Sequence, residues 1–391
     1  MKGSKHPVIF KEIGDVKVTS SVDLSWNAPG TNVYCAALDL SKAYDRTNHD
    51  VIIRKLIDSE IPMSIVKIFQ FMFRNTDVCV RFNGVNGEFF RVKNGLRQGG
   101  CSSSLLFAYY VNEVIEKIKS LDIGCILKGM KINIVAFADD ILLMCPSKVG
   151  LQILIDEISR IFDKLYLRFN TDKSKYIVFR HKSNLRSFGS ININNAQLEK
   201  VSSLKYLGIF LSEDFSIKGD VDRALKSFLK QFNAMFQKFN FLNSEVLSFL
   251  FKTYTTSFYG INLWFEHKIQ PSHIRNLEVA YHKAIKKIVG IEVWRSNHEA
   301  CDLMGIDLFK HFLSKRMAKF YFSAISSECK MFRMLRYHFM FSSQLYKILK
   351  ERFNAYYQIE NVIGNDKDAL IARISFVQMR EPRSNYVYEP G

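Results

Sequence analysis

A pair of adjacent aspartates between two short apolar runs is the feature that most restricts how this chain can fold. Residues 133–145 read NIVAFADDILLMC, so Asp139 and Asp140 separate two runs that are each too short for a helix. Such an arrangement is typical of a β-hairpin, which would present both carboxylates at its turn. A third carboxylate, Asp39, lies near the end of an apolar run at residues 33–40, which predicts a buried strand.

Carboxylates at the ends of buried strands are costly unless a positive group accompanies them. Burial penalises an unpaired charge, and neighbouring like charges repel each other. A divalent metal relieves both, because Mg²⁺ takes hard oxygen ligands and two ions ~3.5–4 Å apart stabilise the attacking and leaving oxygens of a phosphoryl transfer. An Asp-Asp doublet by itself is a weak indication, because most doublets lie in solvated turns.

The other patterns predict an antiparallel sheet backed by helices, which is an α+β fold. Alternation around two Asn-Gly steps predicts a hairpin at residues 78–92, and Asn48 or Asp50 is expected near the N-cap of the first helix. Beyond residue 214 the pattern is mainly helical. The predicted helices span residues 51–61, 61–73, 104–121 and 151–169, and further strands are predicted at residues 175–179 and 204–212.

Basic side chains outnumber acidic ones, with 55 Lys and Arg against 38 Asp and Glu and a net charge of +17. This excess favours a polyanionic partner, nucleic acid first, and scattered solvated lysines are the alternative. The seven cysteines form no C-x-x-C pair and no Cys/His cluster at zinc spacing, which indicates reduced thiols in an intracellular protein. No apolar stretch has the ~18–20 residues of a membrane span, so no membrane association is expected.

Five segments, in order, resemble the palm motifs of reverse transcriptases. The residues of these segments, including AYDRTNHDVIIRKL, most resemble those of non-LTR (LINE-type) retrotransposons. The resemblance covers about residues 33–320. Five matches in order are far more specific than any one of them. They are LDLSKAYD at 38–45, NGLRQGGCSSSLLF at 94–107, FADD at 137–140, LRFNTDKSKYIVF at 167–179 and KYLGIFLS at 205–212.

The resemblance implies a polymerase palm with truncated fingers, followed by a mainly helical thumb and a C-terminal extension. No basic fingers motif is found upstream of the palm and no endonuclease-like acid/His cluster precedes it, so we expect a fragment that lacks most of the fingers and the endonuclease. The expected domains are residual fingers at 1–32, the palm with partial fingers at 33–215, the helical thumb at 216–290 and a helical C-terminal extension at 291–391.

The resemblance also implies the catalytic roles. Asp39 and Asp139 would bridge two Mg²⁺ ions, for which Mn²⁺ can substitute, and Asp140 would be a further ligand or orient the other ligands. Lys173 corresponds to the lysine that protonates the pyrophosphate leaving group as a general acid, with Lys175 as its rival. The predicted catalytic residues are therefore these three aspartates and Lys173.

The nucleotide site is implied by the first two motifs. Tyr44 lies five residues after Asp39, where the family has an aromatic steric gate against the 2′-hydroxyl, and the alternative is a core aromatic. The run that follows Gly99 departs from the Cys-Pro-Leu-Ser-Pro-like family pattern, so we expect a looser turn there. The predicted nucleotide-binding residues are Leu40 (through its backbone carbonyl), Tyr44, Arg97, Gln98, Gly99 and Phe137, and the predicted primer grip is Leu207 and Gly208.

Two basic stripes occur in the C-terminal half. Lys283, Lys286 and Lys287 have i, i+3, i+4 spacing, which places them on one helical face. Such a face would contact the phosphates of a duplex, and a solvated face is the alternative. His311, Lys315, Arg316 and Lys319 form a second stripe.

The sequence therefore predicts an RNA-directed DNA polymerase of a non-LTR retrotransposon. Its expected partners are an RNA template, a DNA primer or target and deoxynucleotides, in an intracellular ribonucleoprotein of the nucleus or cytoplasm. Two alternatives stay open, an intron-type reverse transcriptase and a nucleic-acid-binding remnant of the palm without turnover. The sequence does not indicate an oligomeric state.

Overall fold

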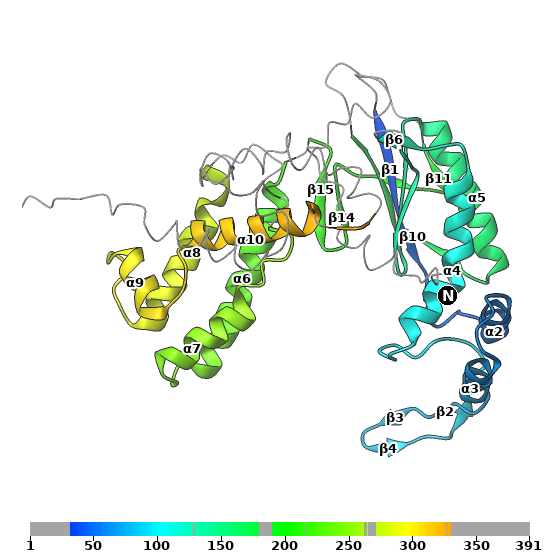
Figure 1. Cartoon of the computed structure of the whole chain (residues 1–391), viewed down its shortest axis with the longest axis horizontal. Helices are drawn as coiled ribbons and strands as arrows, with labels where there is room; N and C mark the ends of the chain where they lie inside the picture. Colours follow the sequence, from blue (N-terminus) through cyan, green and yellow to red (C-terminus); the bar gives the residue numbers. More distant parts are fainter. Residues whose placement is uncertain are drawn as a thin grey trace, which may run out of the picture. The chain divides into compact units, whose positions relative to one another are not determined.

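In the computed structural model, the strand predicted at residues 33–40 is the centre of a five-stranded sheet (Figure 1). This strand, β1 (Val33–Leu40), pairs antiparallel with β10 (Phe169–Phe179) on one side and with β9 (Asp140–Cys145) on the other. β8 (Ile134–Phe137) pairs with β9 at one edge. At the other edge the short β13 (Glu199–Lys200) runs parallel to β10, so the sheet is antiparallel, as predicted, apart from this strand.

The structure describes residues 32–127, 130–179, 190–214, 216–261, 264, 271–325 and 327–329. The predicted residual fingers at 1–32 lie outside these residues except for Asn32, and so does the predicted C-terminal extension beyond residue 329. The chain divides into two compact units, with the change between them at residues 207–215. The first unit holds the sheet, and the second holds both the predicted thumb and the described part of the predicted extension.

Two long helices pack against the sheet and against each other: α4 (Ser103–Ser120) and α5 (Lys148–Lys164). Alternation along β1 turns Ala36, Leu38 and Leu40 toward this helical layer, where they join one buried cluster. Burial of a leucine side chain such as those of Leu38 and Leu40 contributes about 1.5–3 kcal/mol to stability. Asp39 lies between Leu38 and Leu40 in sequence and therefore faces the opposite side of the sheet.

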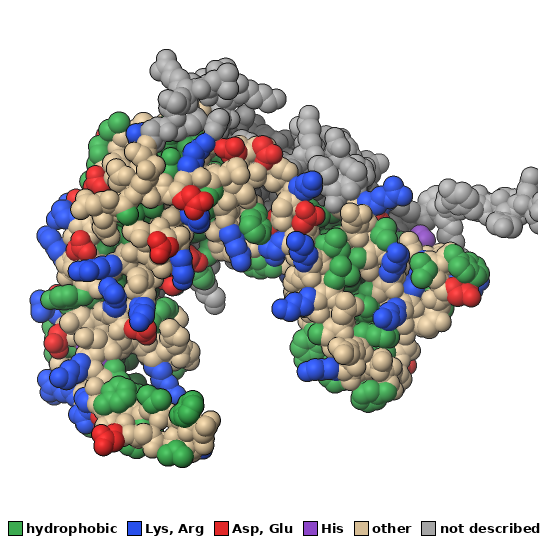
Figure 2. All heavy atoms as spheres, turned by 180° about the vertical axis from the view of Figure 1, so that it is seen from behind, with side chains coloured by type: hydrophobic (Ala, Val, Ile, Leu, Met, Phe, Trp, Pro, Cys, Tyr) green, Lys and Arg blue, Asp and Glu red, His purple; other side chains and the backbone are tan. Residues whose placement is uncertain are grey.

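Two further helices follow β1 in the chain, α2 (His49–Asp58) and α3 (Met63–Arg74). Asn48 is the N-cap of α2, because its side chain accepts a hydrogen bond from the amide of Val51 at 3.1 Å. The predicted hairpin follows α3, with β2 (Asp77–Val78) paired to β5 (Phe90–Arg91) and β3 (Arg81–Phe82) paired to β4 (Val85–Asn86). Figure 2 shows hydrophobic side chains grouped at the free end of this hairpin, where Phe82 and Val85 are exposed.

Three short hairpins complete the first unit's strands, the last at its boundary. The segment at 204–212, predicted as one strand, is instead a separate hairpin, because Leu207 and Gly208 both adopt left-handed φ angles of 46° and 78° and form a two-residue turn. The helix predicted at 151–169 ends at Lys164, since Tyr166 takes a φ of 59° and β10 begins at Phe169. The hairpins are β6 (Cys125–Leu127) with β7 (Met130–Ile132), β11 (Asn192–Ile193) with β12 (Ala196–Gln197), and β14 (Ser203–Tyr206) with β15 (Ile209–Ser212).

The second unit is helical and has an aromatic core. Phe228 on α6 packs against Phe251 and Phe258, and Tyr281 on α8 packs against the same two rings and Phe309. All five side chains are buried. The helices are α6 (Lys218–Phe239), α7 (Ser244–Leu250), the π-helical turn η1 (Phe251–Thr255), α8 (Pro271–Val289), α9 (Asn297–Met304) and α10 (Phe309–Ile325).

No helix in the described part of the chain is both long enough and apolar enough to span a membrane.

A histidine is buried beside this aromatic core. Burial, and secondarily the positive charge of Lys286, lower the pKa of His282 to about 4. The amide of Phe309 donates to its Nε2 at 3.4 Å, which requires the neutral ring. Folding therefore keeps His282 uncharged at a pH where the unfolded chain would protonate it.

Acidification should destabilise the second unit through His282. At a pH between the unfolded pKa of His282, about 6.5, and its lower folded pKa, the histidine is protonated in the unfolded chain and neutral in the folded one. The contribution of His282 to stability is therefore complete at pH 7 and is lost as the pH falls. We expect the free energy of unfolding in urea to drop by about 2 kcal/mol more between pH 7 and pH 5 in the wild type than in His282→Gln. An equal drop in both proteins would contradict this.

Candidate active site

The predicted catalytic carboxylates lie at one end of the central strands. Asp39 on β1 is directly opposite Asp140 on β9 and opposite Asn170 on β10. Its amide donates to Ser174 Oγ on β10 at 3.1 Å. Asp39 is therefore fixed from both sides by backbone pairing, and its side chain is one-third exposed.

The doublet lies at the turn of the hairpin, as predicted. Phe137 pairs with Asp140, which leaves Ala138 and Asp139 as a two-residue turn between β8 and β9. Ala138 has a φ of 53°, a left-handed conformation that a residue with a Cβ rarely adopts. Strain of this kind persists where the surrounding sheet fixes the turn, and it is frequent at functional sites.

The three carboxylates influence one another electrostatically. The pKa of Asp140 is raised, first by desolvation of its carboxyl and then by the negative charges of Asp139 and Asp39. The buried Tyr206 contacts the same hairpin, because its hydroxyl donates a hydrogen bond to the carbonyl of Val135 on β8 at 3.3 Å. Burial, and secondarily the charge of Asp140, raise the pKa of Tyr206. Burial and neighbouring negative charge therefore both disfavour the ionised form of Asp140.

A bulge in β10 brings a lysine to this site. Between the pairs Ala37↔Lys175 and Asp39↔Asn170, β1 advances two residues while β10 advances five. The additional residues of β10 include Lys173, whose Nζ lies 3.9 Å from Asp39 Oδ2. Bulges commonly redirect a side chain next to an active site.

The two candidate lysines occupy different environments. Lys175, the rival of Lys173, pairs with Glu199 on β13. The Lys173 side chain is mostly exposed, and its only ion pair among the described residues is with Asp39. Of the two, Lys173 is the one positioned beside the carboxylates.

A divalent cation suits the chemistry of these donors, since all three are carboxylates, and desolvation together with the charges of Asp139 and Asp39 raises the pKa of Asp140. Their present positions do not make a complete ligand set, because the described residues contain no group of three or more His, Cys, Asp or Glu that could hold a metal ion. Reverse transcriptases generally depend on divalent metal. The assignment of Asp39, Asp139 and Asp140 as ligands therefore stays a prediction.

Tyr44 lies in the loop that follows β1. Its ring is half-buried and stacks on Phe107 of α4, with 4.9 Å between ring centroids and 20° between the planes. The backbone of this loop is bound to the second motif, because Leu96 donates its amide to the carbonyl of Tyr44 at 2.8 Å and Gly95 donates to Thr47 at 2.7 Å. The ring thus has a fixed position, with part of its surface available to a ligand.

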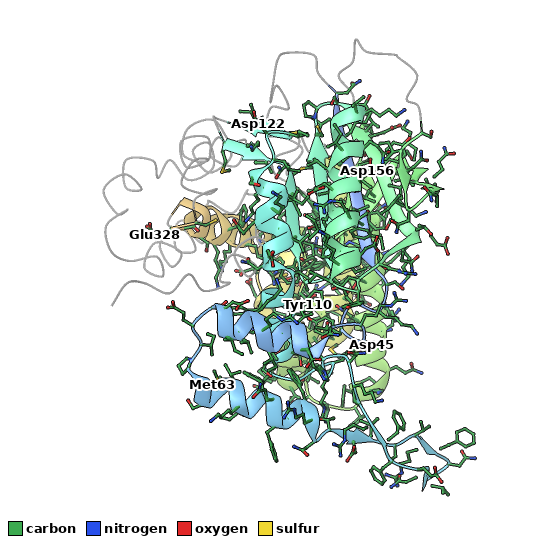
Figure 3. The ribbon with its side chains drawn as sticks, turned by 90° about the vertical axis from the view of Figure 1, so that its right-hand side faces the viewer. Asp45, Met63, Tyr110, Asp122, Asp156 and Glu328 are labelled. Carbon is green, nitrogen blue, oxygen red and sulfur yellow. The ribbon has the colours of Figure 1, made fainter. Side chains whose placement is uncertain are left out.

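Glycine is required where the two motifs meet. A Cβ on Gly95, which has a φ of 97°, would lie 3.0 Å from the carbonyl oxygen of Asp45. Tyr110 of α4 also holds this loop in place. Its hydroxyl accepts a hydrogen bond from the Asn48 amide at 3.3 Å and donates one to the Leu165 carbonyl. In Figure 3, Tyr110 lies beside the segment that carries Asp45.

The loop of Arg97, Gln98 and Gly99 is exposed and leads into α4. The turn is held by Ser103, whose Oγ donates to the Arg97 carbonyl at 2.6 Å, and by the amide of Gly100, which donates to the same carbonyl at 3.1 Å. A Cβ on Gly100 would lie 2.6 Å from Ser103 Oγ. These contacts hold the turn without prolines, and the looseness expected from the sequence stays a prediction.

One of the predicted phosphate-binding lysines has a structural role instead. Lys286 is buried, and its Nζ donates to the carbonyl oxygens of Val293 at 2.7 Å and of Arg295. Its predicted contact with nucleic-acid phosphates is therefore wrong, because the ammonium group caps the loop between α8 and α9. Lys283 and Lys287 are exposed, and Lys287 Nζ lies 4.6 Å from the centroid of the Phe236 ring.

The second basic stripe is also engaged internally. Lys315 pairs with Asp307 at 2.7 Å, and Arg316 donates to the carbonyls of Ser257 and Thr256. Residues that contribute to the site but were not predicted are Ser174 and Tyr110. Their roles depend on strand register and helix packing, for which these residue types give no sequence signal.

Comparison with protein families agrees with this geometry. Residues 12–211, just over half of the chain, match the model described as reverse transcriptase (RNA-dependent DNA polymerase). The chain belongs to this family. The match includes every predicted catalytic, nucleotide-binding and primer-grip residue.

The related proteins are Pol polyproteins of R2 elements. The retrovirus-related Pol polyprotein from the type-1 retrotransposable element R2 of Nasonia vitripennis is 24% identical over 51% of this chain and 21% of its own length. That of the type-2 element R2DM of Drosophila melanogaster is 27% identical over 45% of this chain and 17% of its own length. The chain thus spans about a fifth of the length of these relatives, and its similarity to them supports the prediction of a non-LTR reverse transcriptase.

Solved structures of telomerases are also similar, at a low level. Apo telomerase from Candida tropicalis matches with 13% identity and a TM-score of 0.43, over 93% of this chain and 56% of that chain. Telomerase from Candida albicans, in complex with the TWJ fragment of telomeric RNA, matches with 13% identity and a TM-score of 0.42, over 91% and 52%. These values are too low to bear on function.

Divalent metal should stabilise the free protein by relieving the repulsion at Asp140. A ligand that binds only the folded state raises its melting temperature with concentration, and metal binding requires deprotonated carboxylates. We expect Mg²⁺ or Mn²⁺ to raise the melting temperature of the wild type and of Asp156→Asn, a control carboxylate on α5, but not of Asp39→Asn/Asp140→Asn. An equal rise in all three proteins would exclude these carboxylates as ligands.

Proposed function

We propose that this chain is an RNA-directed DNA polymerase, which adds deoxynucleotides to a primer 3′-hydroxyl under the direction of an RNA template. The observation that carries the proposal is the position of Asp39, opposite Asp140 in register and 3.9 Å from Lys173. One strand end thus combines carboxylates, the ligand type that Mg²⁺ prefers, with the ammonium group of a lysine. Membership of the reverse transcriptase family supports the same reaction.

The proposed cofactor is a pair of Mg²⁺ ions, for which Mn²⁺ can substitute. Asp39 and Asp139 would hold the ions, and Asp140 would be a further ligand or would orient the other two. When bound, the metal activates the primer hydroxyl and neutralises charge on the phosphates. The raised pKa of Asp140 supports this proposal, because desolvation and then the negative charges of Asp139 and Asp39 disfavour its ionised form, which a bound cation would favour.

The chain's own residues would divide the remaining work. Lys173 would protonate the departing pyrophosphate, since its ammonium group is exposed at the strand end. Tyr44 would lie beneath the sugar, and Arg97, Gln98, Gly99, Phe137 and the carbonyl of Leu40 would line the nucleotide site. Leu207 and Gly208, as the turn of the β14–β15 hairpin, would support the primer end.

The proposed partners are an RNA template and a DNA primer or target, in a retroelement ribonucleoprotein of the nucleus or cytoplasm. The two exposed lysines of α8, Lys283 and Lys287, support a contact with a duplex backbone. A palm without turnover is the second candidate. The presence of all three carboxylates at one strand end favours the active enzyme.

Removal of one metal-binding carboxylate should abolish synthesis. On poly(rA)/oligo(dT) with Mg²⁺, we expect Asp139→Asn to reduce primer extension at least ~100-fold while the melting temperature is maintained, because a neutral amide cannot replace the charge. Asp156→Asn is the matched control, since Asp156 accepts from Gln152 on the exposed side of α5. Activity of Asp139→Asn within tenfold of wild type would refute the metal assignment.

Tyr44 should determine the choice of sugar. Without the ring, the 2′-hydroxyl of a ribonucleotide would no longer clash, so Tyr44→Ala should lose ~2–3 kcal/mol of discrimination, a ~30- to 150-fold fall in preference for dGTP over GTP opposite C. Tyr44→Phe retains the ring and its stacking on Phe107, and it should keep the preference. An unchanged ratio in an active Tyr44→Ala protein would make Tyr44 a packing residue only.

A further inference from the structure

A cavity of about 530 Å³ lies in the first unit, outside the predicted catalytic set. Three segments that are distant in sequence form it: the loop after β1, the turn between α5 and β10, and the turn between β11 and β12. Asp45, labelled in Figure 3, marks the first segment. The lining residues are Arg46, Asp163, Tyr166, Arg168, Asn194 and Asn195.

The two arginines give the cavity a positive balance. Neither Arg46 nor Arg168 has an ion pair or a side-chain hydrogen bond with another described residue, and the single lining carboxylate is Asp163. The backbone carbonyl of Asp163, as distinct from its carboxylate, already accepts a hydrogen bond from the amide of Tyr166 at 3.1 Å. Guanidinium groups bind phosphate through paired, directed hydrogen bonds, and these two are available for such a ligand.

Tyr166 adds an aromatic face to these charges. Its φ of 59° reverses the chain at the end of α5, and its side chain is 64% exposed instead of packed in the core. Asn194 and Asn195, with φ angles of 48° and 65°, form the tight turn opposite and expose their side chains. Amide groups both donate and accept hydrogen bonds, as the edges of nucleobases require.

We infer that this cavity binds a phosphorylated nucleoside, with the phosphate on Arg46 and Arg168, the base stacked on Tyr166 and the base edge at the asparagines. Aromatic stacking combined with cationic side chains is the usual chemistry of single-stranded nucleic-acid sites. The nucleoside can belong to an RNA strand or to a free nucleotide. Binding requires neither metal nor catalysis, so the inference goes beyond the proposed polymerase activity.

The cavity is connected to the active site through the backbone. The amide of Ser41, two residues after Asp39, donates to the carbonyl of Arg168 at 2.8 Å. Arg46 lies in the loop that carries Tyr44, and its amide donates to the carbonyl of Lys42 at 3.0 Å. A ligand that immobilises both arginines would therefore also restrict the loop beneath the proposed nucleotide site.

Photo-crosslinking tests the inference at the residue level. The Asp139→Asn protein in EDTA is irradiated with a ten-nucleotide oligo(U) that contains 5-iodouridine or, in a second arm, with 8-azido-ATP, and adducts are mapped by mass spectrometry. We expect an adduct at Tyr166 in at least one arm, and the arm that labels identifies RNA or free nucleotide as the source. Because the irradiation is done in EDTA and measures binding alone, failure of the polymerase proposal would leave this result unaffected.

Matched variants separate specific binding from general attraction. Arg46→Ala/Arg168→Ala should reduce the Tyr166 adduct at least tenfold, and the single variants Arg46→Gln and Arg168→Gln should each reduce it if the double variant does not fold. Arg160→Ala is the control, because Arg160 lies on α5 and pairs with Glu157 outside the cavity. No adduct at Tyr166 in either arm, or an adduct that these arginine variants leave unchanged, would overturn the inference.

Discussion

The pairing of β1 with β9 and β10 at the same time is the constraint on which the active site depends. A strand between two antiparallel neighbours has its backbone hydrogen bonds used on both edges, so its residues cannot slide without breaking two ladders. Asp39 takes its position from this strand, and Asp140 takes its position from the neighbour. The helices α4 and α5 contribute by burying the alternate residues of β1, which leaves Asp39 on the other face of the sheet.

Charge at the end of this sheet is balanced only in part. Burial, and secondarily the charges of Asp139 and Asp39, raise the pKa of Asp140, and the ion pair of Lys173 is with Asp39. A more complete internal neutralisation would stabilise the free protein, but it would also compete with a cation. The unfavourable electrostatics at this point are therefore consistent with a site that binds metal and phosphate. In the second unit, by contrast, the buried Asp220 is neutralised internally, because it pairs with Arg223 at 2.7 Å and accepts a hydrogen bond from Trp264.

Features set by local spacing could be predicted from the sequence, and features set by register or packing could not. The doublet at a hairpin turn follows from two short apolar runs, and the Asn48 cap follows from residue type. The resemblance favours Lys173 over Lys175, but the bulge in β10 that brings Lys173 to Asp39 is revealed by no pattern of apolar residues. The spacing of Lys283, Lys286 and Lys287 predicts one shared helical face, but helical periodicity does not say which side of a helix is buried, and Lys286 is buried.

The bulge in β10 also bears on how this segment can tolerate length changes. Because β10 uses five residues where β1 uses two, the residues between Asn170 and Lys175 are fitted to one particular gap in the ladder. Deletion of a single residue there would either pull Lys173 away from Asp39 or move every side chain beyond it to the opposite face of the sheet. Substitutions in this segment preserve the spacing, whereas insertions and deletions do not, so its length is constrained independently of the side chains of Lys173 and Ser174.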